Sequence, residues 1–426
     1  MFFPSPRLTH TTTQPVKTHM KHLLIVLDGV GDLPHPSLNG KTPLQAAIAP
    51  HLQRLAQAGQ TGHLRIAQNI APESDVGVCS VLGHDPFEHH VGRGLLEAKG
   101  ADVPFKTGDL ALRANFATCG PDGKTLLDRR AGRGLSQEDA QALAEQINRH
   151  VKLSGATFEF KATVGHRGVL VIRAQEPLDC HITNTDPAYE VVNGLGSAKA
   201  AFQMAITPAC AWKDEAGSRH AAALVNEFTE KSFLVLDASP TNARRKQSGA
   251  LPANCVLLRD PESRDQKLKA LPGNWAILSE MPMEEGIAKL MDMAIEPMHH
   301  DKDGKKAYPK IAQQTLEALE KYDGVYVHLK GPDVFGHDGD AKGKMKSIEE
   351  IDALFFKHLL EKLDLENVRI AVTGDHSTPC VLHAHSADPV PFLLSGAGIP
   401  AKNQPFDETN SGPTINGWEL MPKLLK

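Results

Sequence analysis

Short, continuous apolar runs alternate with amphipathic segments along most of the chain. Runs of this kind are typical of strands that are buried on both faces of a parallel sheet. The predicted strands are residues 23–27, 233–236, 275–278, 324–330 and 368–372. Helical patterns lie between them, at residues 42–59 with a break at Pro50, 198–229, 283–293 and 315–321. This alternation predicts an α/β fold with a mostly parallel sheet flanked by helices.

From about residue 105 the pattern changes to short segments with a period of two residues. Strands are predicted at residues 111–118, 157–163 and 168–173, with a helix at 136–152. We expect a smaller α+β domain, residues 106–190, inserted into a core domain formed by residues 20–105 and 191–426. Residues 1–19 are rich in Pro, Thr and His and are expected to be a disordered extension, with either Met1 or Met20 as the true start. A weak organellar transit peptide is the alternative for this segment.

The composition is ordinary for a globular protein. The 426 residues are 41% hydrophobic and 23% charged, and the formal net charge is −5. This mild acidity gives no basic surface for nucleic acid, and no apolar run is long enough to cross a bilayer. The six cysteines include no CxxC pair, which argues against a disulfide framework and a cysteine-based zinc site. Free thiols favour a reducing, cytoplasmic location.

The densest chemical signal follows the predicted strand at residues 368–372. The chain turns at Gly374 into Asp375 and His376, and His385 follows in the same loop region. A carboxylate and imidazoles just past a strand end are a typical way to hold a divalent cation at the edge of an α/β sheet. The loop therefore predicts at least part of a metal site.

Three other segments offer matching groups. Asp28 follows the first predicted strand, while Asp333 and His337 are four residues apart, so one helical turn would bring both onto one face. Ser74 precedes a short apolar helix, where it is either an N-cap or a nucleophile. Together, three carboxylates, three imidazoles and a hydroxyl suit two nearby divalent ions better than one tetrahedral site. Two such ions favour phosphoryl displacement.

The order of these motifs resembles a known family. In chain order they are LLIVLDG, PESD, HLKGPDVFGHDGD, GDHSTPC and AHSADPVPFLL. This order resembles the alkaline phosphatase superfamily and, more narrowly, the archaeal-type 2,3-bisphosphoglycerate-independent phosphoglycerate mutases. GRG, RANFAT, DRRAGR, HRG, NTDP and PAN extend the resemblance from about residue 21 to the C-terminus. It implies an alkaline-phosphatase-like core domain interrupted by a substrate-binding domain.

The resemblance also implies two metal sites and a phosphoserine intermediate. One site would be formed by Asp333, His337 and His385. The other would be formed by Asp28, Ser74, Asp375 and His376. Ser74 would accept the phosphoryl group of 3-phosphoglycerate, and the 2-hydroxyl of the retained glycerate would recapture it. Mn²⁺ is the favoured metal, with Mg²⁺, Zn²⁺ and Co²⁺ as alternatives.

Basic side chains in and around the insertion are expected to bind the substrate, a small phosphorylated carboxylic acid. Guanidinium groups suit this role because they pair with carboxylates and phosphates through two hydrogen bonds. The candidates are Arg93, Arg129, Arg130, Arg133, His166, Arg167, Arg245, Arg259 and Lys330. A solvated surface position is the alternative for each. No nucleic acid or membrane partner is expected, and assembly into a homo-oligomer is left open.

Two positions depart from the family pattern. Val78 stands where a polar side chain is expected, and Asn184 stands where many members have aspartate. Either change would suit a phosphotransferase with another small hydroxy acid as acceptor, such as a homoserine kinase-like relative. A metal-dependent phosphomonoesterase, with water as acceptor, is a second alternative. A catalytically silent metal-binding protein is a third, and the complete set of ligand residues argues against it.

Overall fold

The computed structural model describes residues 20–192, 195–199, 201–299, 301 and 304–426. The disordered extension expected at residues 1–19 lies outside this part of the chain. All six cysteines are free. None of the described helices combines the length and the apolar character needed to cross a membrane.

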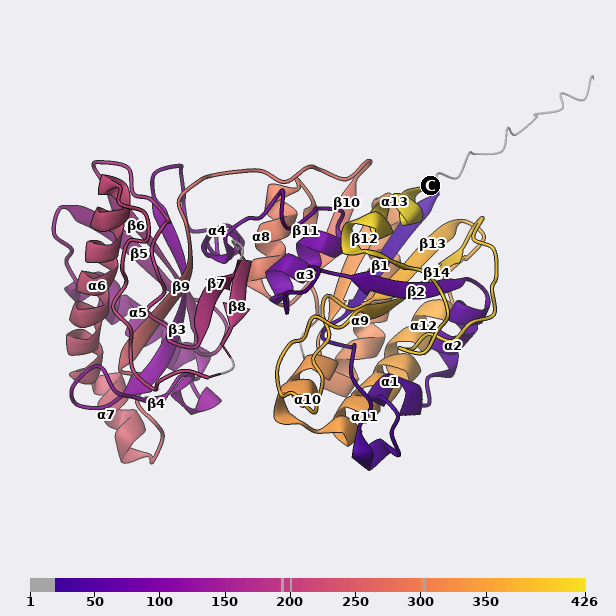
Figure 1. The fold of residues 1–426 in the computed structure, drawn as a ribbon, viewed down its shortest axis with the longest axis horizontal. Coiled ribbons are helices and arrows are strands. Elements are labelled where there is room, and N and C mark those ends of the chain that lie inside the picture. Colours follow the sequence, from indigo (N-terminus) through magenta and orange to yellow (C-terminus); the bar gives the residue numbers. More distant parts are fainter. Residues whose placement is uncertain (1–19, 193–194, 200, 300, 302–303) are drawn as a thin grey trace, which may run out of the picture.

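An eight-stranded sheet forms the centre of the larger part of the molecule (Figure 1). Its order is β11-β10-β12-β1-β13-β14-β2-β15, and neighbouring strands are parallel except in the two pairs that β14 makes. The strands are β1 (Lys21–Leu27), β2 (Gln60–Arg65), β10 (Trp275–Leu278), β11 (Ala294–Glu296), β12 (Gly324–Leu329), β13 (Val368–Thr373), β14 (Val390–Gly396) and β15 (Thr414–Asn416). The predicted α/β fold with a mainly parallel sheet is confirmed.

Helices cover both faces of this sheet (Figure 1). α9, α11 and α12 lie against one another and α9 reaches β12, while α8 contacts β10 and α3. The helices of this part are α1 (Pro43–Ala46), α2 (Pro50–Gln57), α3 (Ser74–Val81), α4 (Arg93–Gly100), α8 (Pro282–Leu290), α9 (Gly304–Lys321), α10 (Pro332–Asp338), α11 (Ala341–Ile351), α12 (Lys357–Leu360) and α13 (Leu420–Leu425), with the short turns η1 (Pro36–Leu38), η3 (Asp352–Phe356) and η4 (Gly417–Glu419). The predicted break at Pro50 is confirmed, because this proline opens α2, where its missing N–H costs nothing.

A second, antiparallel sheet forms the smaller part. Its strands are β3 (Leu110–Cys119), β4 (Leu126–Asp128), β5 (Ala156–Ala162), β6 (Arg167–Ala174) and β9 (Cys255–Glu262). β3 is central, because β4, β6 and β9 all pair with it. The remaining elements are η2 (Ala131–Arg133), α5 (Gln137–His150), α6 (Ala216–Asp237), α7 (Pro240–Gln247) and a hairpin of β7 (Tyr189–Val192) and β8 (Leu195–Ala198). α5 matches the helix predicted at residues 136–152.

The smaller part of the molecule corrects three predictions. β9 pairs with β3 although more than a hundred residues separate them, and α6 packs against β9, so this part extends well beyond residue 190. The strand predicted at residues 233–236 is wrong, because these residues form the last turns of α6. The helix predicted at residues 198–229 begins only at Ala216. A four-residue apolar run fits a strand and a buried helical turn equally well, and only its partners decide.

Helix α4 joins the two parts (Figure 1). It packs against α8 on one side and against β3, β6 and β9 on the other. Glycines allow this close approach: a Cβ at Gly94 would lie 2.3 Å from the carbonyl oxygen of Ala111, and one at Gly100 would lie 1.7 Å from that of Pro282. α4 therefore sets the position of the second sheet relative to the first.

Candidate active site

The carboxyl ends of three neighbouring parallel strands bring the predicted metal ligands together. Asp28 directly follows β1, while Asp375 and His376 follow β13 after one glycine. α10 begins shortly after β12 and carries Asp333 and His337. Parallel strands end at one edge of a sheet, so segments that are hundreds of residues apart in sequence meet there.

Ser74 belongs to a group with Asp28, Asp375 and His376. The Ser74 Oγ lies 3.3 Å from His376 Nε2. The same ring nitrogen lies 3.2 Å from Asp375 Oδ2 and 3.5 Å from Asp28 Oδ1. Asp375 and His376 are fully buried, and the Asp375 Oδ1 accepts a hydrogen bond from the backbone N–H of Gly29. The side chains of these four residues thus lie close together.

Asp333, His337 and His385 form the second group. His337 Nε2 and His385 Nε2 each lie 3.6 Å from a carboxylate oxygen of Asp333. The His385 ring stacks on His376 with 3.7 Å between ring centroids, so the two groups are adjacent. The Nδ1 atom of His385 lies 2.8 Å from the carbonyl oxygen of Pro72, which fixes the orientation of the ring.

Ser74 is the first residue of α3 rather than its cap. Glu73 occupies the N-cap position and makes no side-chain capping bond. The hydroxyl of Ser74 is therefore not used to cap the helix and points at His376. The interpretation of Ser74 as a simple N-cap does not fit this geometry.

The donor atoms fit divalent cations. Asp28 Oδ1 and Asp375 Oδ2 are buried side-chain oxygens without a hydrogen-bond partner. Ligand atoms of Asp28, Asp333 and His376 lie within 4.8 Å of one another, as do those of Asp333, His337 and His385. A buried carboxylate oxygen that lacks a hydrogen bond favours a nearby positive charge. Carboxylate oxygens and imidazole nitrogens in such numbers suit divalent metal ions.

A buried network supports Asp28 from behind. The Lys330 Nζ lies 2.8 Å from Asp28 Oδ2 and 3.0 Å from Glu284 Oε1, and His328 Nε2 lies 3.1 Å from the same ammonium. Burial alone would raise the pKa of Asp28, but the Lys330 ammonium and the His328 ring outweigh it and hold that pKa well below its ordinary value. Asp28 is thus kept ionised.

Arginines gather on the side of this site that faces the second sheet. Arg93 and Arg113 share Glu97, at 3.2 and 3.6 Å, and Arg93 also lies 3.6 Å from Asp75. The Nε and Nη1 atoms of Arg113 are buried without a hydrogen-bond partner, and so are those of Arg259. Burial, together with neighbouring Arg259 and Arg93, lowers the pKa of Arg113 to about 9.

Other predicted basic residues stand nearby. Burial, with Arg167 and Arg130 as further causes, lowers the pKa of His166 to about 3, so this ring is neutral among the arginines. Arg133 reaches across to α10, where its Nη1 lies 3.6 Å from Asp338 Oδ1. Positive groups of this density suit a ligand with several negative charges.

Arg129 and Arg245 are already paired. Arg129 makes a two-bond contact with Asp186, at 2.7 and 3.0 Å. Arg245 donates to Asp139 at 3.2 Å and to the carbonyl oxygens of Leu251 and Gly134. These contacts of Arg245 hold α7 to its neighbours, so the structure does not support its predicted role in substrate binding.

Comparison with known proteins places this chain in one family. The family model described as 2,3-bisphosphoglycerate-independent phosphoglycerate mutase matches residues 56–242. A protein of that name from Aeropyrum pernix is 38% identical over 424 residues, covering 95% of this chain and 99% of the relative. Another, from Methanopyrus kandleri, is 38% identical over 399 residues, covering 91% of this chain and 90% of the relative. The chain belongs to this family.

Two solved structures resemble this family member along nearly its whole length. The PH0037 protein from Pyrococcus horikoshii is 28% identical, with a TM-score of 0.74, and the match covers 96% of this chain and 97% of that one. A cofactor-independent phosphoglycerate mutase from Thermoplasma acidophilum is also 28% identical, with a TM-score of 0.61, and the match covers 95% and 99%.

A cavity of about 890 Å³ runs from the start of α3 to the loops of the second part. Glu73, Asp75 and Arg93 line one end, and Tyr189 and Asp260 line another wall. The candidate metal ligands do not line it, so the cavity borders the site on the side of Ser74. Its size suits a small molecule.

Several residues that shape the site were missed by the sequence analysis. Glu284 has no motif around it, and nothing in the sequence indicates that its fully buried carboxylate meets Lys330. His328 and Arg113 lie inside the HLKGPD and RANFAT motifs, which could have drawn attention to them. Tyr189 was also missed, although it stacks on Arg259.

Proposed function

We propose that this chain interconverts 3-phosphoglycerate and 2-phosphoglycerate without a bisphosphoglycerate cofactor, by way of a phosphoserine at Ser74. The main support is the hydroxyl of Ser74, which lies 3.3 Å from His376 at the start of a helix and beside two buried carboxylates. The names of the relatives point to the same reaction.

Two divalent cations would complete the site, with Mn²⁺ favoured. Asp333, His337 and His385 would hold one, and Asp28, Ser74, Asp375 and His376 the other. When bound, these cations would supply positive charge that stabilises the ionised serine and the transferring phosphoryl group. The uncompensated Asp28 Oδ1 and Asp375 Oδ2 support this assignment.

The side chains of the protein would divide the remaining work. Arg93, Arg113 and Arg259 would bind the carboxylate and phosphate, which fixes the phosphorus in line with Ser74. The Ser74 oxygen forms a bond to phosphorus as the bond from phosphorus to O3 of glycerate breaks, and the proton leaves the serine hydroxyl for the departing alkoxide. Lys330 lies beside Asp28, where its charge would face the phosphoryl oxygens.

Return transfer reverses these bonds on a different hydroxyl. The arginines would keep glycerate in the cavity while it turns. Its O2 then bonds to phosphorus, the bond to Ser74 Oγ breaks, and the proton of the 2-hydroxyl returns to the serine. Water as the acceptor would give inorganic phosphate instead, so retention of glycerate separates a mutase from a phosphatase.

The two departures from the family pattern lie in structural positions. Val78 is a residue of α3 and is fully buried in the hydrophobic core. The Asn184 side chain accepts from the backbone N–H of Asp260 and donates to the carbonyl oxygen of Tyr189, so it holds the hairpin of β7 and β8 to β9. Neither observation favours another acceptor over glycerate.

The decisive experiment is an assay of the purified full chain with 3-phosphoglycerate and Mn²⁺ and without bisphosphoglycerate. We expect 2-phosphoglycerate, and we expect Ser74→Ala to lower kcat by at least about a thousandfold. Ser80→Ala, a buried serine on the same helix that donates to Ile66, is the matched control and should stay active. Release of inorganic phosphate without 2-phosphoglycerate would favour the phosphomonoesterase, and an active Ser74→Ala variant would rule out the proposed nucleophile.

A cytoplasmic location belongs to the same proposal, since all six cysteines are free and the substrate is a metabolic intermediate. Assembly into a homo-oligomer stays a prediction.

A further inference from the structure

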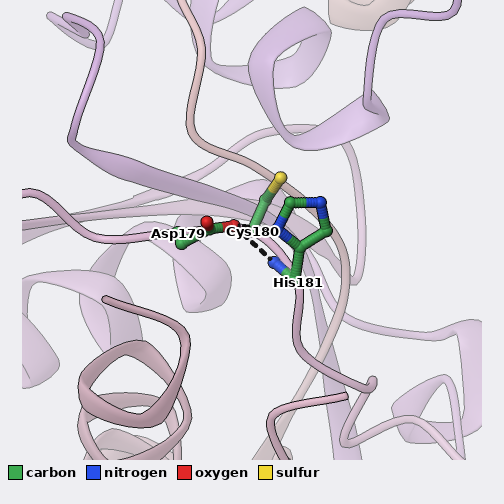
Figure 2. A group of neighbouring side chains, drawn as sticks. All are labelled: Asp179, Cys180 and His181. Carbon is green, nitrogen blue, oxygen red and sulfur yellow. Dashed lines mark hydrogen bonds and ion pairs between the residues drawn. The ribbon is translucent and has the colours of Figure 1, made fainter. Parts of the chain in front are cut away.

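A second cluster of ligand atoms lies on the cavity wall, in the second part of the molecule. Asp179, Cys180 and His181 follow one another in the connection between β6 and β7, and their ligand atoms lie within 4.8 Å of one another. Figure 2 shows the carboxylate of Asp179 beside the His181 ring, with the Cys180 sulfur above the same ring. Cys180 and His181 line the cavity.

Acidic side chains gather around this cluster. His181 Nδ1 forms an ion pair with Asp179, yet this buried nitrogen makes no well-directed hydrogen bond. The side chain of Glu215 approaches Asp179, and Glu262 lies close to Cys180. Arg264 is the nearby basic residue, but it is bound to Glu262 at 3.2 Å and its side chain is mostly exposed.

The backbone fixes the three side chains in place. The N–H of Cys180 donates to Ser263 Oγ at 3.1 Å, and the N–H of Trp212 donates to the carbonyl oxygen of His181 at 3.1 Å. The Trp212 ring meets the His181 ring edge to face, with 4.6 Å between centroids. A ligand set held in this way loses little conformational entropy when it binds a metal.

We propose that Asp179, Cys180 and His181 bind a divalent transition-metal ion of the zinc class. A carboxylate oxygen, a thiolate sulfur and an imidazole nitrogen are all ligands that zinc accepts. Tetrahedral zinc places its ligand atoms about 3.3–3.8 Å apart, which small side-chain rotations reach from the observed spacing. The cavity supplies the fourth position. The proposed site uses one cysteine together with a carboxylate and an imidazole, so it needs no CxxC pair. The spacing of the cysteines therefore did not reveal this site.

This site differs chemically from the candidate active site. Among the described residues, the groups around Ser74 and Asp333 contain no cysteine, whereas this one contains Cys180. A sulfur–metal signature therefore distinguishes this cluster from the candidate active site, and the cysteine variants assign it to Cys180. The proposal stands whether or not the chain is a mutase.

Cobalt gives the sharpest test. The full-length protein is freed of metal, titrated with Co²⁺ and followed in the near-ultraviolet, where thiolate-to-cobalt charge transfer absorbs. We expect this band in the wild type and its loss in Cys180→Ser. Cys210→Ser is the matched control, because Cys210 lines the same cavity outside the cluster. Metal analysis after Zn²⁺ loading should show about one equivalent less in Cys180→Ser than in Cys210→Ser.

His181→Gln and Asp179→Asn keep the test informative if Cys180→Ser fails to fold, with circular dichroism as the check on folding. Both variants should raise the apparent Kd for Co²⁺, measured from the charge-transfer band, by at least about tenfold. An effect of this size is typical when a metal ligand or a residue beside it is lost. Absence of the band in the wild type would overturn the proposal. So would a band that survives Cys180→Ser, or zinc contents that are equal in the two cysteine variants.

Discussion

Tyr189 sits between two arginines at the cavity wall. The guanidinium carbon of Arg259 lies 3.4 Å from the centroid of the Tyr189 ring, and that of Arg129 lies 5.3 Å from it. Arg259 is buried, and two of its nitrogens have no hydrogen-bond partner. A flat aromatic face restrains such a group while leaving its N–H donors free. Under the proposed function, Tyr189 would therefore orient Arg259 for a negatively charged ligand.

Removing the Tyr189 ring should weaken substrate binding more than it slows the chemistry. Under the proposed function, Tyr189→Ala is expected to raise KM for 3-phosphoglycerate by about tenfold, the scale of a partly desolvated cation–π contact, with a smaller effect on kcat. Tyr189→Phe keeps the ring and should stay close to the wild type. Steady-state kinetics of the two variants checks this, and equal losses in both would refute a role for the ring.

Glu408 gives a pH dependence of stability. It accepts hydrogen bonds from the backbone N–H of Asp32 and the hydroxyl of Thr42, but burial outweighs them and raises its pKa from 4.5 to about 7. The folded state therefore binds more protons than the unfolded state between these values. This contribution to stability is complete below pH 4.5 and is lost as the pH rises through 7.

Glu408→Gln should remove this loss of folding stability at high pH. Because Gln cannot ionise, the variant is expected to be more stable than the wild type at pH 8 by on the order of 2 kcal/mol, and about equal to it at pH 5. Urea unfolding at both pH values measures the difference. Glu366→Gln, at an exposed position, is the control and should show no such change with pH. A variant that gains nothing at pH 8 would contradict the raised pKa.

Helix α3 holds Ser74 through very close backbone packing. A Cβ at Gly77 would lie 2.2 Å from the carbonyl oxygen of Asp375, well inside contact distance. Gly77 thus lets the first turn of α3 rest directly on the loop that carries Asp375 and His376. The distance between Ser74 and His376 therefore depends on the absence of a side chain at Gly77.

Gly77→Ala should move α3 away from that loop. A displacement on the scale of 1 Å at a reacting group costs about a hundredfold in kcat/KM, while the helix itself should survive, since alanine favours helix. The assay of 2-phosphoglycerate formation tests this together with circular dichroism. Gly120→Ala is the matched control, because the nearest atom to its Cβ would be 3.5 Å away. Full activity in Gly77→Ala would show that the close packing is not needed.

At the scale of the whole molecule, the strand ends of one sheet concentrate charge. Asp28, Asp333 and Asp375 approach one another from three different strand ends, and Asp28 and Asp375 are buried. Without bound metal ions, repulsion among these carboxylates disfavours the folded state, and so do the oxygens of Asp28 and Asp375 that lack a hydrogen bond. Divalent ions bound there should stabilise the entire fold.

Metal removal should therefore lower the stability of the protein as well as its activity. With free Mn²⁺ at about 100 times its Kd, linkage predicts a gain of about 2.7 kcal/mol over the chelated protein, seen as a higher Tm. Asp333→Asn should reduce this metal-dependent gain, whereas Asp214→Asn, at an exposed position outside the site, should keep it. A Tm that is the same with Mn²⁺ and with chelator would contradict a metal site at the strand ends.

The sequence predicted the parts of the site that local chemistry reveals. Buried strands read as continuous apolar runs, and Asp28 and Asp375 stand just after two of them. The spacing of Asp333 and His337 matches one turn of α10. These signals are local, because strand periodicity and helical spacing involve residues that are close in the chain.

Contacts between residues that are far apart in the sequence determined the rest of the fold and of the candidate site. β9 joins β3 in the second sheet, so the predicted boundary at residue 190 was too early. Glu284 meets Lys330 only because α8 packs beside β10, the neighbour of β12 in the sheet, and Cys180 and His181 meet the cavity only because the second part folds beside α4. The alternation of residues along a chain encodes which face of an element is buried. It does not encode which distant element covers that face, because many partners would bury the same apolar surface.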